Sequence, residues 1–344
     1  MSHRLPLLYS PDVESVPPDE VEEIHKVVQA LRNLLKRDEG TSGERRRDVH
    51  VKSHGCPVAE LKVLPGLDST LREGLFRDET TYPAVIRFSS SSPWAQPDAV
   101  PDARGVAIKV QGVAGTFLLP GVVEPSTQDF VFANHPTFVA KDVKDYLRLQ
   151  QVRLQGVRLP LAAAETFTAG SWNPSDWRWR EALAAAQVAT QFSSSPAALT
   201  YYSMAPFRFG QYVAKFRLRP AAGVPNSQKS LFPALATRPE AFREALAKTL
   251  RGGALTFEFQ VQLWTNRDSM PIEDATVEWP EAESPYQSVA HLEIPAQRLD
   301  TSPQGLGDDL SFNPWNALVE HQPLGGINRV RRAAYETSAA WRTA

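Results

Sequence analysis

Apolar and polar residues follow two different periods along this 344-residue chain. Apolar residues three and four apart predict a helix over residues 18–37, behind an irregular arm and ahead of a polar linker at 40–47. Short apolar runs predict strands at 49–52, 58–63, 84–88, 105–110, 128–132, 207–220, 255–264 and 289–294. Helical spacing returns at 137–151, 172–192 and 238–250. We therefore divide the chain into an N-terminal arm and helix at 1–40 and a main domain at 41–344.

The predicted strands indicate a closed barrel in a protein of the α+β class. About eight strands with few helical crossovers between them favour antiparallel pairing. The alternation of Leu255, Phe257, Phe259 and Val261 gives one strand an apolar face that would point into such a barrel. The pattern therefore predicts an antiparallel β-barrel accompanied by helices.

Composition and charge exclude several classes of protein. The 37 basic and 39 acidic residues nearly balance, which gives no support for nucleic acid as a partner. No apolar run approaches the ~20 residues of a membrane-spanning helix, and the N-terminus does not read as a signal peptide. The single cysteine, Cys56, excludes an internal disulfide and a cysteine-based zinc or iron–sulfur site. A cytoplasmic location is the simplest expectation.

The C-terminal segment carries the most informative spacing of polar residues. If it is a helix, steps of four and seven residues place Arg331, Tyr335 and Arg342 on one face. Free Tyr has a pKa of about 10, and a close permanent cation favours the anionic form. A tyrosinate is an uncommon axial ligand of haem iron. The alternative interpretation is an amphipathic helix with its arginines in water and its tyrosine packed inward.

Four further segments change the balance between these interpretations. They read RRRDVHVKSHG (45–55), YPAVIRFSSSS (82–92), PDARGVAIKV (101–110) and QDFVFANHPTFVAKDVKDY (128–146). With the C-terminal segment, their order and separations resemble those of the haem catalase family, from about Arg47 to Arg342. The resemblance implies an eight-stranded antiparallel barrel with haem b bound at one side and helices around it. Because the chain stops soon after Tyr335, it is most similar to the short, catalase-related branch, which includes catalase-like peroxidases.

The resemblance implies three catalytic residues. His50 matches the distal histidine, whose neutral imidazole can take a proton from one peroxide oxygen and return it to the other. Ser89 matches the serine that hydrogen-bonds this histidine and fixes its tautomer. Asn134 is the candidate for the distal amide that polarises peroxide. Strict alignment, however, places Ala133 at that position, so either the loop shifts by one residue or the amide is missing.

The resemblance also implies a set of haem-binding residues. Tyr335 would be the iron ligand, paired with Arg331. Arg47, Arg87 and Arg342 match family arginines that pair with the haem propionates, and Arg342 also lies by the proximal ligand. The planar guanidinium suits carboxylates because it can contact both oxygens.

Three more positions are expected around the haem. Val49 matches a valine over the iron, and Tyr146 matches an aromatic residue that stacks on the distal face of the haem. Phe138 would line the same pocket, or would be a core aromatic. Because Arg47 and His50 are three residues apart, a regular strand would place them on opposite faces. If both contact one haem, the strand must start after Arg47 or contain a bulge.

The function expected from the resemblance is that of a haem-dependent hydroperoxidase. Its substrate would be hydrogen peroxide or an organic hydroperoxide, with a small organic reductant as a further partner. Ala133 keeps open a haem-binding carrier or sensor without turnover. A third alternative is a fatty-acid hydroperoxide isomerase of the allene oxide synthase type, but such enzymes have a threonine where this chain has Val49. The sequence leaves open whether the chain forms a homo-oligomer.

Overall fold

The computed structural model describes residues 4–100, 102–119, 126–156, 195–221, 239–299 and 309–344, together with parts of 168–187. About half of the predicted helix at 172–192 lies outside these residues.

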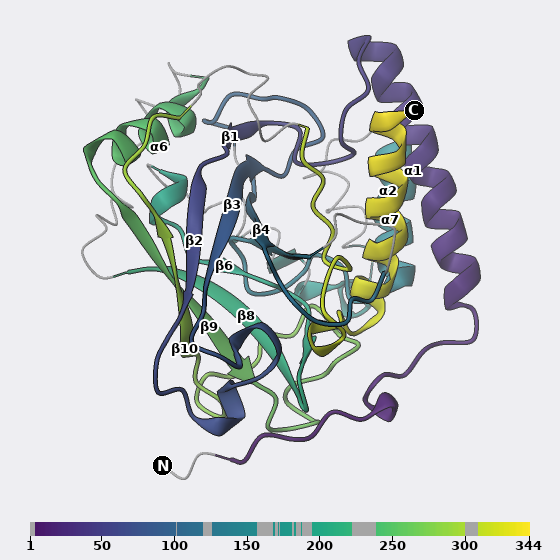
Figure 1. The fold of residues 1–344 in the computed structure, drawn as a ribbon. Coiled ribbons are helices and arrows are strands. Elements are labelled where there is room, and N and C mark those ends of the chain that lie inside the picture. Colours follow the sequence, from purple (N-terminus) through teal and green to yellow (C-terminus); the bar gives the residue numbers. More distant parts are fainter. Residues whose placement is uncertain are drawn as a thin grey trace.

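The centre of the molecule is a closed barrel of eight antiparallel strands (Figure 1). These are β2 (Val58–Val63), β3 (Thr81–Ser90), β4 (Arg104–Gln111), β5 (Thr127–Ala133), β6 (Tyr201–Tyr202), β8 (Tyr212–Pro220), β9 (Leu255–Leu263) and β10 (Gln287–Ile294). They pair in the order β3-β2-β10-β9-β8-β6-β5-β4, and pairing between β4 and β3 closes the ring. Two short strands pair outside it, β1 (Ser53–Gly55) with β3 and β7 (Phe207–Phe209) with β8. The predicted eight-stranded antiparallel barrel of the α+β class is confirmed.

Alternate residues of each strand fill the barrel with apolar side chains. Phe257, Phe259 and Val261 of β9 point inward, as their alternation predicted. The rings of Phe130 and Phe259 meet edge to face, with centroids 5.0 Å apart. Each such side chain stabilises the fold by roughly 1.5–3 kcal/mol through burial. The opposite faces of the same strands point out of the barrel and carry its polar residues.

His321 is the exception inside this aromatic core. Its ring is fully buried against Phe76, Phe130 and Phe209, and its Nε2 accepts a hydrogen bond from the backbone N–H of Leu75 at 2.9 Å. Burial lowers the pKa of His321 from 6.5 to about 3. The folded protein therefore holds this histidine in its neutral form over a range of pH in which the unfolded chain binds a proton.

We predict that His321 makes the fold less stable in acid. Between pH 6.5 and about 3 the unfolded chain binds one more proton at this site, so the free energy of unfolding falls as the pH falls. The slope from one such group is about 1.4 kcal/mol per pH unit. Urea unfolding between pH 4.5 and 6.5 should show a smaller slope for His321→Gln, whose amide oxygen can still accept from Leu75. Equal slopes for the two proteins would contradict this assignment.

Three long helices stand side by side along one side of the barrel (Figure 1). They are α1 (Glu20–Ser42), α2 (Val143–Leu154) and α7 (Gly326–Thr343), and α6 (Ala241–Gly252) lies beside β1. An apolar cluster of Val27, Leu31 and Leu34 with Val143 and Val330 joins the first three. Short 3₁₀ helices occur at Pro11–Val13, Ser69–Leu71, Gly74–Phe76, Pro174–Asp176, Pro196–Ala198 and Val319–His321. The N-terminal helix therefore packs against helices of its own chain.

Arg329 fixes the beginning of α7. Its guanidinium contacts the carboxylates of Glu14, Glu20 and Glu273, which come from the N-terminal arm, α1 and the β9–β10 connection. The side chain is largely buried, and removing one partner of such an ion pair leaves uncompensated charge. The network therefore sets the position of α7, whose following turns carry Tyr335.

Four predicted elements differ from the structure, and one of them is the helix at 137–151, which begins only at Val143 and ends at Leu154. The predicted strand at 49–52 is wrong, because none of these four residues is in a strand and His50 has a left-handed backbone with φ of 59°. The predicted strand at 207–220 is divided by a turn at Gly210, whose φ is also 59°. The first helix ends at Ser42 rather than near residue 37, with Gly43 as its left-handed cap. None of the helices in the described ranges is both long and apolar enough to cross a membrane.

Candidate functional site

A cavity of about 110 Å³ lies between the outer face of the barrel and α7. The barrel wall consists of outward-facing residues in register on β3, β4 and β5, where Ser89 pairs with Gly105 and Arg87 pairs with Ala107. Helix α2, the segment at 47–50 and the segment at 311–312 close the other sides. The lining residues include Arg47, Val49, His50, Arg87, Ser89, Gly105, Val131, Tyr146, Phe312, Tyr335, Ser338 and Arg342.

His50 enters the cavity from a strained backbone. A left-handed conformation costs a non-glycine residue about 1–2 kcal/mol, so surrounding contacts must hold it. Arg87 Nη2 donates to the carbonyl of His50 at 3.0 Å, and the N–H of His50 donates to the carbonyl of Ser91 at 3.2 Å. Nδ1 of His50 shares a hydrogen bond of 2.9 Å with Oγ of Ser89. The predicted contact between Ser89 and His50 is thus present.

The absence of a side chain at Gly105 makes room for the His50 ring. A Cβ added to Gly105 would lie 2.7 Å from Nδ1 of His50 and closer still to Cε1. Those separations are below normal van der Waals contact, so only glycine allows the ring to rest on β4 here. Gly105 is a site residue that sequence reasoning missed, although the quoted segment PDARGVAIKV contained it.

The His50 imidazole is held neutral. Burial is the main cause that lowers its pKa from 6.5 to about 3, and the nearby guanidiniums of Arg87, Arg331 and Arg47 contribute to the same shift. The ring borders the cavity, so part of its surface remains accessible from that side. It can therefore accept a proton from a molecule in the cavity at neutral pH.

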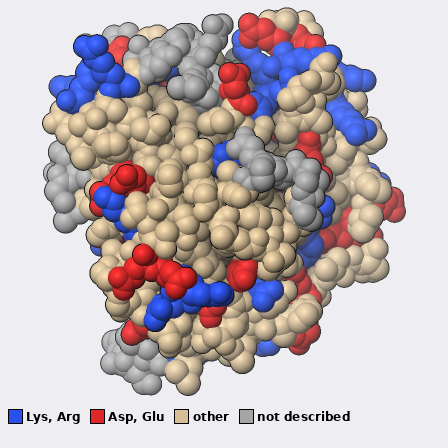
Figure 2. Space-filling model, in the orientation of Figure 1, with Lys and Arg blue, Asp and Glu red and all other residues tan. Residues whose placement is uncertain are grey.

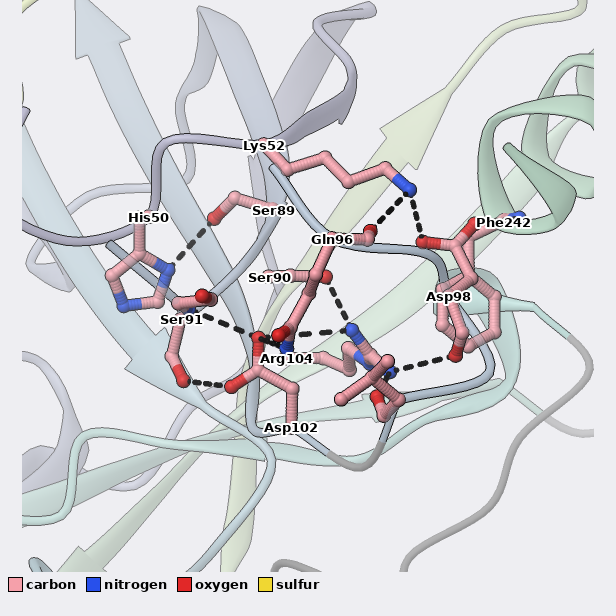
Figure 3. A network of polar contacts seen from close by, with 12 residues as sticks. His50, Lys52, Ser89, Ser90, Ser91, Gln96, Asp98, Asp102, Arg104 and Phe242 are labelled. Atoms are coloured by element: carbon pink, nitrogen blue, oxygen red, sulfur yellow. Dashed lines mark hydrogen bonds and ion pairs between the residues drawn. The ribbon is translucent and has the colours of Figure 1, made fainter. Parts of the chain in front are cut away.

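A buried polar network fixes the chain immediately after His50 (Figure 3). Nζ of Lys52 lies 2.7 Å from Oδ1 of Asp98, and both side chains are buried. Asp98 also accepts the backbone N–H of Phe242 at 2.8 Å, at the start of α6. The guanidinium of Arg104 lies over the ring of Phe242, 4.5 Å from its centroid. Lys52 was visible in the VHVK segment, whereas nothing in the sequence indicated Asp98.

Tyr335 faces the cavity from α7, with Arg331 one turn before it. Nη2 of Arg331 donates to the phenol oxygen at 3.4 Å, and the guanidinium carbon lies 5.6 Å from the centre of the tyrosine ring. Arg331 is buried and also donates to Oδ1 of Asn328 at 3.2 Å. The helical spacing therefore brings a cation to the tyrosine oxygen, as the sequence predicted.

The predicted arginines Arg47, Arg87 and Arg342 all line the cavity. Arg47 donates to the carbonyl of Leu310, and Nη2 of Arg342 donates to Oγ of Ser311 at 2.7 Å. Arg87 holds the backbone of His50. A regular strand would have placed Arg47 and His50 on opposite faces. Because residues 49–52 do not form a strand, both residues line the cavity.

Three predicted residues do not line the cavity. Arg331 is not among the described residues that line it, although it contacts Tyr335, which does. Oδ1 of Asn134 accepts the backbone N–H of Arg104 at 2.7 Å, and the side chain is buried beside β4. Phe138 packs against Tyr146, with ring centroids 5.9 Å apart, in a small core cluster, as the alternative interpretation expected. Among the described residues that line the cavity there is no asparagine or glutamine. The one-residue shift that would let Asn134 act there does not occur in the structure.

Tyr146 lines the cavity from α2 with a neutral phenol. Burial raises its pKa, and the nearby carboxylate of Asp48 raises it further. Asp48 itself forms a buried ion pair with Arg153 at 2.8 Å, and its N–H donates to Oγ of Ser338 on α7 at 3.2 Å. These contacts join the segment that carries Val49 and His50 to both α2 and α7.

Comparison with known proteins identifies the fold. No family model matches the sequence, and no curated protein matches it. Among solved structures, catalase A from Saccharomyces cerevisiae superposes with a TM-score of 0.69 at 15% identity, covering 89% of this chain and 63% of the yeast chain. This chain has the catalase fold.

Two other catalases agree with this result. A fungal catalase superposes with a TM-score of 0.69 at 14% identity, covering 89% of this chain and 61% of its own. A bacterial catalase superposes with a TM-score of 0.67 at 16% identity, covering 99% of this chain and 64% of its own. This chain thus spans less than two thirds of the length of each of these three catalases.

Proposed function

We propose that this protein is a haem-dependent hydroperoxidase that breaks down hydrogen peroxide or organic hydroperoxides. The observation that carries the proposal is that one cavity on a catalase fold brings together His50 with Ser89 and Tyr335 with Arg331. The first pair suits proton transfer and the second suits an anionic iron ligand.

The residues around the cavity fit haem b in their chemistry. Tyr335 supplies an oxygen ligand, and apolar side chains such as Val49 and Val131 suit the porphyrin faces. Arg47 donates to the carbonyl of Leu310 and Arg342 to the hydroxyl of Ser311, and guanidiniums placed in this way suit propionate carboxylates, with which they form charge-assisted hydrogen bonds. The cavity is smaller than the ~300–1,000 Å³ of typical ligand sites, so haem binding requires lining side chains to move outward.

The protein residues would divide the work as follows. Haem, when bound, supplies the iron redox chemistry that breaks the O–O bond. Neutral His50 takes a proton from one peroxide oxygen and returns it to the other, and Ser89 holds the ring in one orientation. Arg331 stabilises negative charge on the oxygen of Tyr335, which would hold the iron.

The test is reaction of the purified, haem-reconstituted protein with two peroxides. Rapid oxygen release from hydrogen peroxide would show catalase activity. Oxidation of a phenolic donor with cumene hydroperoxide, without much oxygen, would show peroxidase activity. Failure to bind haem would overturn the proposal. An epoxide product from a polyunsaturated fatty-acid hydroperoxide, without an added donor, would identify the isomerase alternative.

A second candidate function is a haem carrier or sensor. It is favoured by the lack of an asparagine or glutamine among the described residues that line the cavity, since no amide is placed there to polarise peroxide. Stoichiometric haem binding with no consumption of either peroxide would support it over the hydroperoxidase.

We predict that Gly105→Ala inactivates the protein without removing haem. The added methyl overlaps the His50 ring, which must swing away from the cavity and from Ser89. Peroxide consumption should fall by about 100-fold, as for loss of a general acid–base group. Gly40→Ala is the control, because a Cβ at Gly40 meets nothing within 4 Å and lies in helix α1. Equal activity of the two variants would mean that the position of His50 is unimportant.

A further inference from the structure

The strained segment at His50 needs support beyond its backbone hydrogen bonds. The N–H groups of His50 and Val51 donate to the carbonyls of Ser91 and Ser92, but at 3.2 and 3.3 Å these bonds are at the long end of the normal range. A residue other than glycine keeps a left-handed backbone only where its surroundings impose it. The side chain of Lys52, two residues later, supplies a firmer attachment for this segment.

The ammonium of Lys52 is fixed by acceptors on two other segments of the chain. It donates to Oδ1 of Asp98 at 2.7 Å, to the carbonyl of Gln96 at 3.0 Å and to the carbonyl of Pro239. The carboxylate of Glu240 lies 3.4 Å away. An ammonium has three protons, so the first three contacts use its full capacity as a donor. Lys52 therefore anchors its segment at one defined place.

Asp98 joins this anchor to the strand beneath His50. Its Oδ2 accepts the backbone N–H of Phe242 at 2.8 Å, at the start of α6. Its carbonyl accepts Nη2 of Arg104 at 3.2 Å, and Arg104 directly precedes Gly105 on β4. The His50 ring rests against Gly105. The same aspartate thus connects the segment that carries His50 with the strand that supports its ring (Figure 3).

The pair of Lys52 and Asp98 is shielded from solvent, because their side chains are 3% and 0% exposed. Figure 2 shows surface Lys and Arg side chains, with some acidic ones, gathered at the upper right of the view, over the end of α1. The buried pair is not part of that surface charge and is screened little by salt. Nδ1 of His54 lies 4.0 Å from Oδ1 of Asp98, but burial lowers the pKa of His54 well below 6.5 and keeps it neutral. Lys52 therefore supplies the charge-assisted hydrogen bond that Asp98 accepts.

We propose that Asp98 is a positioning residue of the peroxide reaction. Through Lys52 and the strand that carries Gly105, it holds the imidazole of His50 where that ring can exchange a proton with peroxide. The inference rests on the proposed hydroperoxidase function. Asp98 is not among the described residues that line the cavity, so it acts through His50 rather than on peroxide or haem. Its loss should slow proton transfer and leave haem binding unchanged.

The first test is amide hydrogen exchange in Asp98→Asn, measured by NMR on the full chain with and without haem. Asparagine keeps the size of the side chain, but its amide nitrogen cannot accept a hydrogen bond, and the ammonium of Lys52 loses its counter-charge. The N–H groups of His50 and Val51 should lose protection by about tenfold, whereas those of β9 should keep theirs. Unchanged exchange at His50 and Val51, or an equal loss in β9, would overturn the proposal.

Kinetics test whether Asp98 acts through His50. Asp98→Asn should lower kcat for peroxide consumption by about 10–100-fold, as for other groups that orient a reacting residue, with haem content and KM unchanged. In a His50→Gln background the same substitution should change the rate by less than about twofold, because the group that Asp98 positions is already absent. Losses that multiply in the double variant would show an effect independent of His50 and would contradict the proposal.

A second pair of variants controls for the loss of a buried charge. Lys52→Met should lower kcat like Asp98→Asn. Lys215→Met is the matched control, since Lys215 is also a buried lysine but lies on β8, outside the described cavity lining, and its rate should equal that of the parent. A parent protein that consumes no peroxide would overturn the hydroperoxidase, and amide exchange at His50 would still decide whether Asp98 holds that segment. An active parent whose Asp98→Asn variant is equally active would overturn the role of Asp98 alone.

Discussion

Tyr335→Phe is expected to abolish stoichiometric haem binding. The substitution removes the phenol oxygen, which the buried Arg331 contacts at 3.4 Å, and leaves the ring and its packing in place. Loss of a supporting group beside a metal ligand typically lowers affinity 10–100-fold, so loss of the ligand itself should cost at least about 100-fold. The measurement is haem content per chain after reconstitution, together with the Soret spectrum.

Two further variants separate the role of the phenol oxygen from general effects on the fold. Tyr212→Phe makes the same chemical change on β8, outside the cavity lining, and should bind haem like the parent protein. Arg331→Lys keeps a cation on α7 but loses the forked guanidinium, so we expect a shifted spectrum and a smaller loss of affinity. Full haem occupancy of Tyr335→Phe, with an unchanged spectrum, would rule out Tyr335 as the ligand.

The arrangement around Tyr335 was predictable because it is local. Residues four and seven apart share a helix face whatever surrounds the helix, so Tyr335 and Arg342 both reach the cavity from α7. The barrel was predictable for a similar reason, because the alternation of apolar residues in β9 and its neighbours indicates which face of each strand is buried.

The segment around His50 was not predictable from its own residues. Two valines flanking a histidine are typical of a strand, yet contacts with distant residues impose a left-handed backbone. Those contacts come from Arg87 on β3 and from the space above Gly105 on β4, and strand pairing alone brings them together. Local pattern contains no information about such long-range contacts.

The sequence could not decide, for a different reason, whether Ala133 or Asn134 lies at the position of the distal amide. Successive residues of a strand point to opposite faces, so an uncertainty of one residue reverses the prediction. The structure fixes the register by pairing Gly105 with Ala133 at the end of β5. Asn134 then turns to Arg104, whose backbone N–H its side chain accepts. The sequence stated the alternatives correctly, but only the pairing of β4 with β5 decides between them.

His50→Gln is expected to reduce peroxide consumption by about 10²–10⁴-fold while haem binding stays intact. Glutamine keeps hydrogen-bonding capacity but cannot carry a proton between the two peroxide oxygens. The pKa of His50 is lowered to about 3, so the parent imidazole is neutral, and competent as a base, throughout pH 5–8. Protonation of this group should therefore lower the parent rate only when the pH falls well below 5. Peroxide consumption across pH 4–8, at constant haem content, measures both effects.

Two matched variants test whether the loss of peroxide consumption is caused by the loss of this particular histidine. Ser89→Ala keeps the imidazole but removes the hydrogen bond at Nδ1, so the rate should fall by about 10–100-fold. His291→Gln makes the same change as His50→Gln on β10, outside the cavity lining, and should leave the rate unchanged. A His50→Gln protein as active as His291→Gln would show that the proton moves through another group or through water. In that case the strained backbone at His50 and the space above Gly105 would serve packing alone.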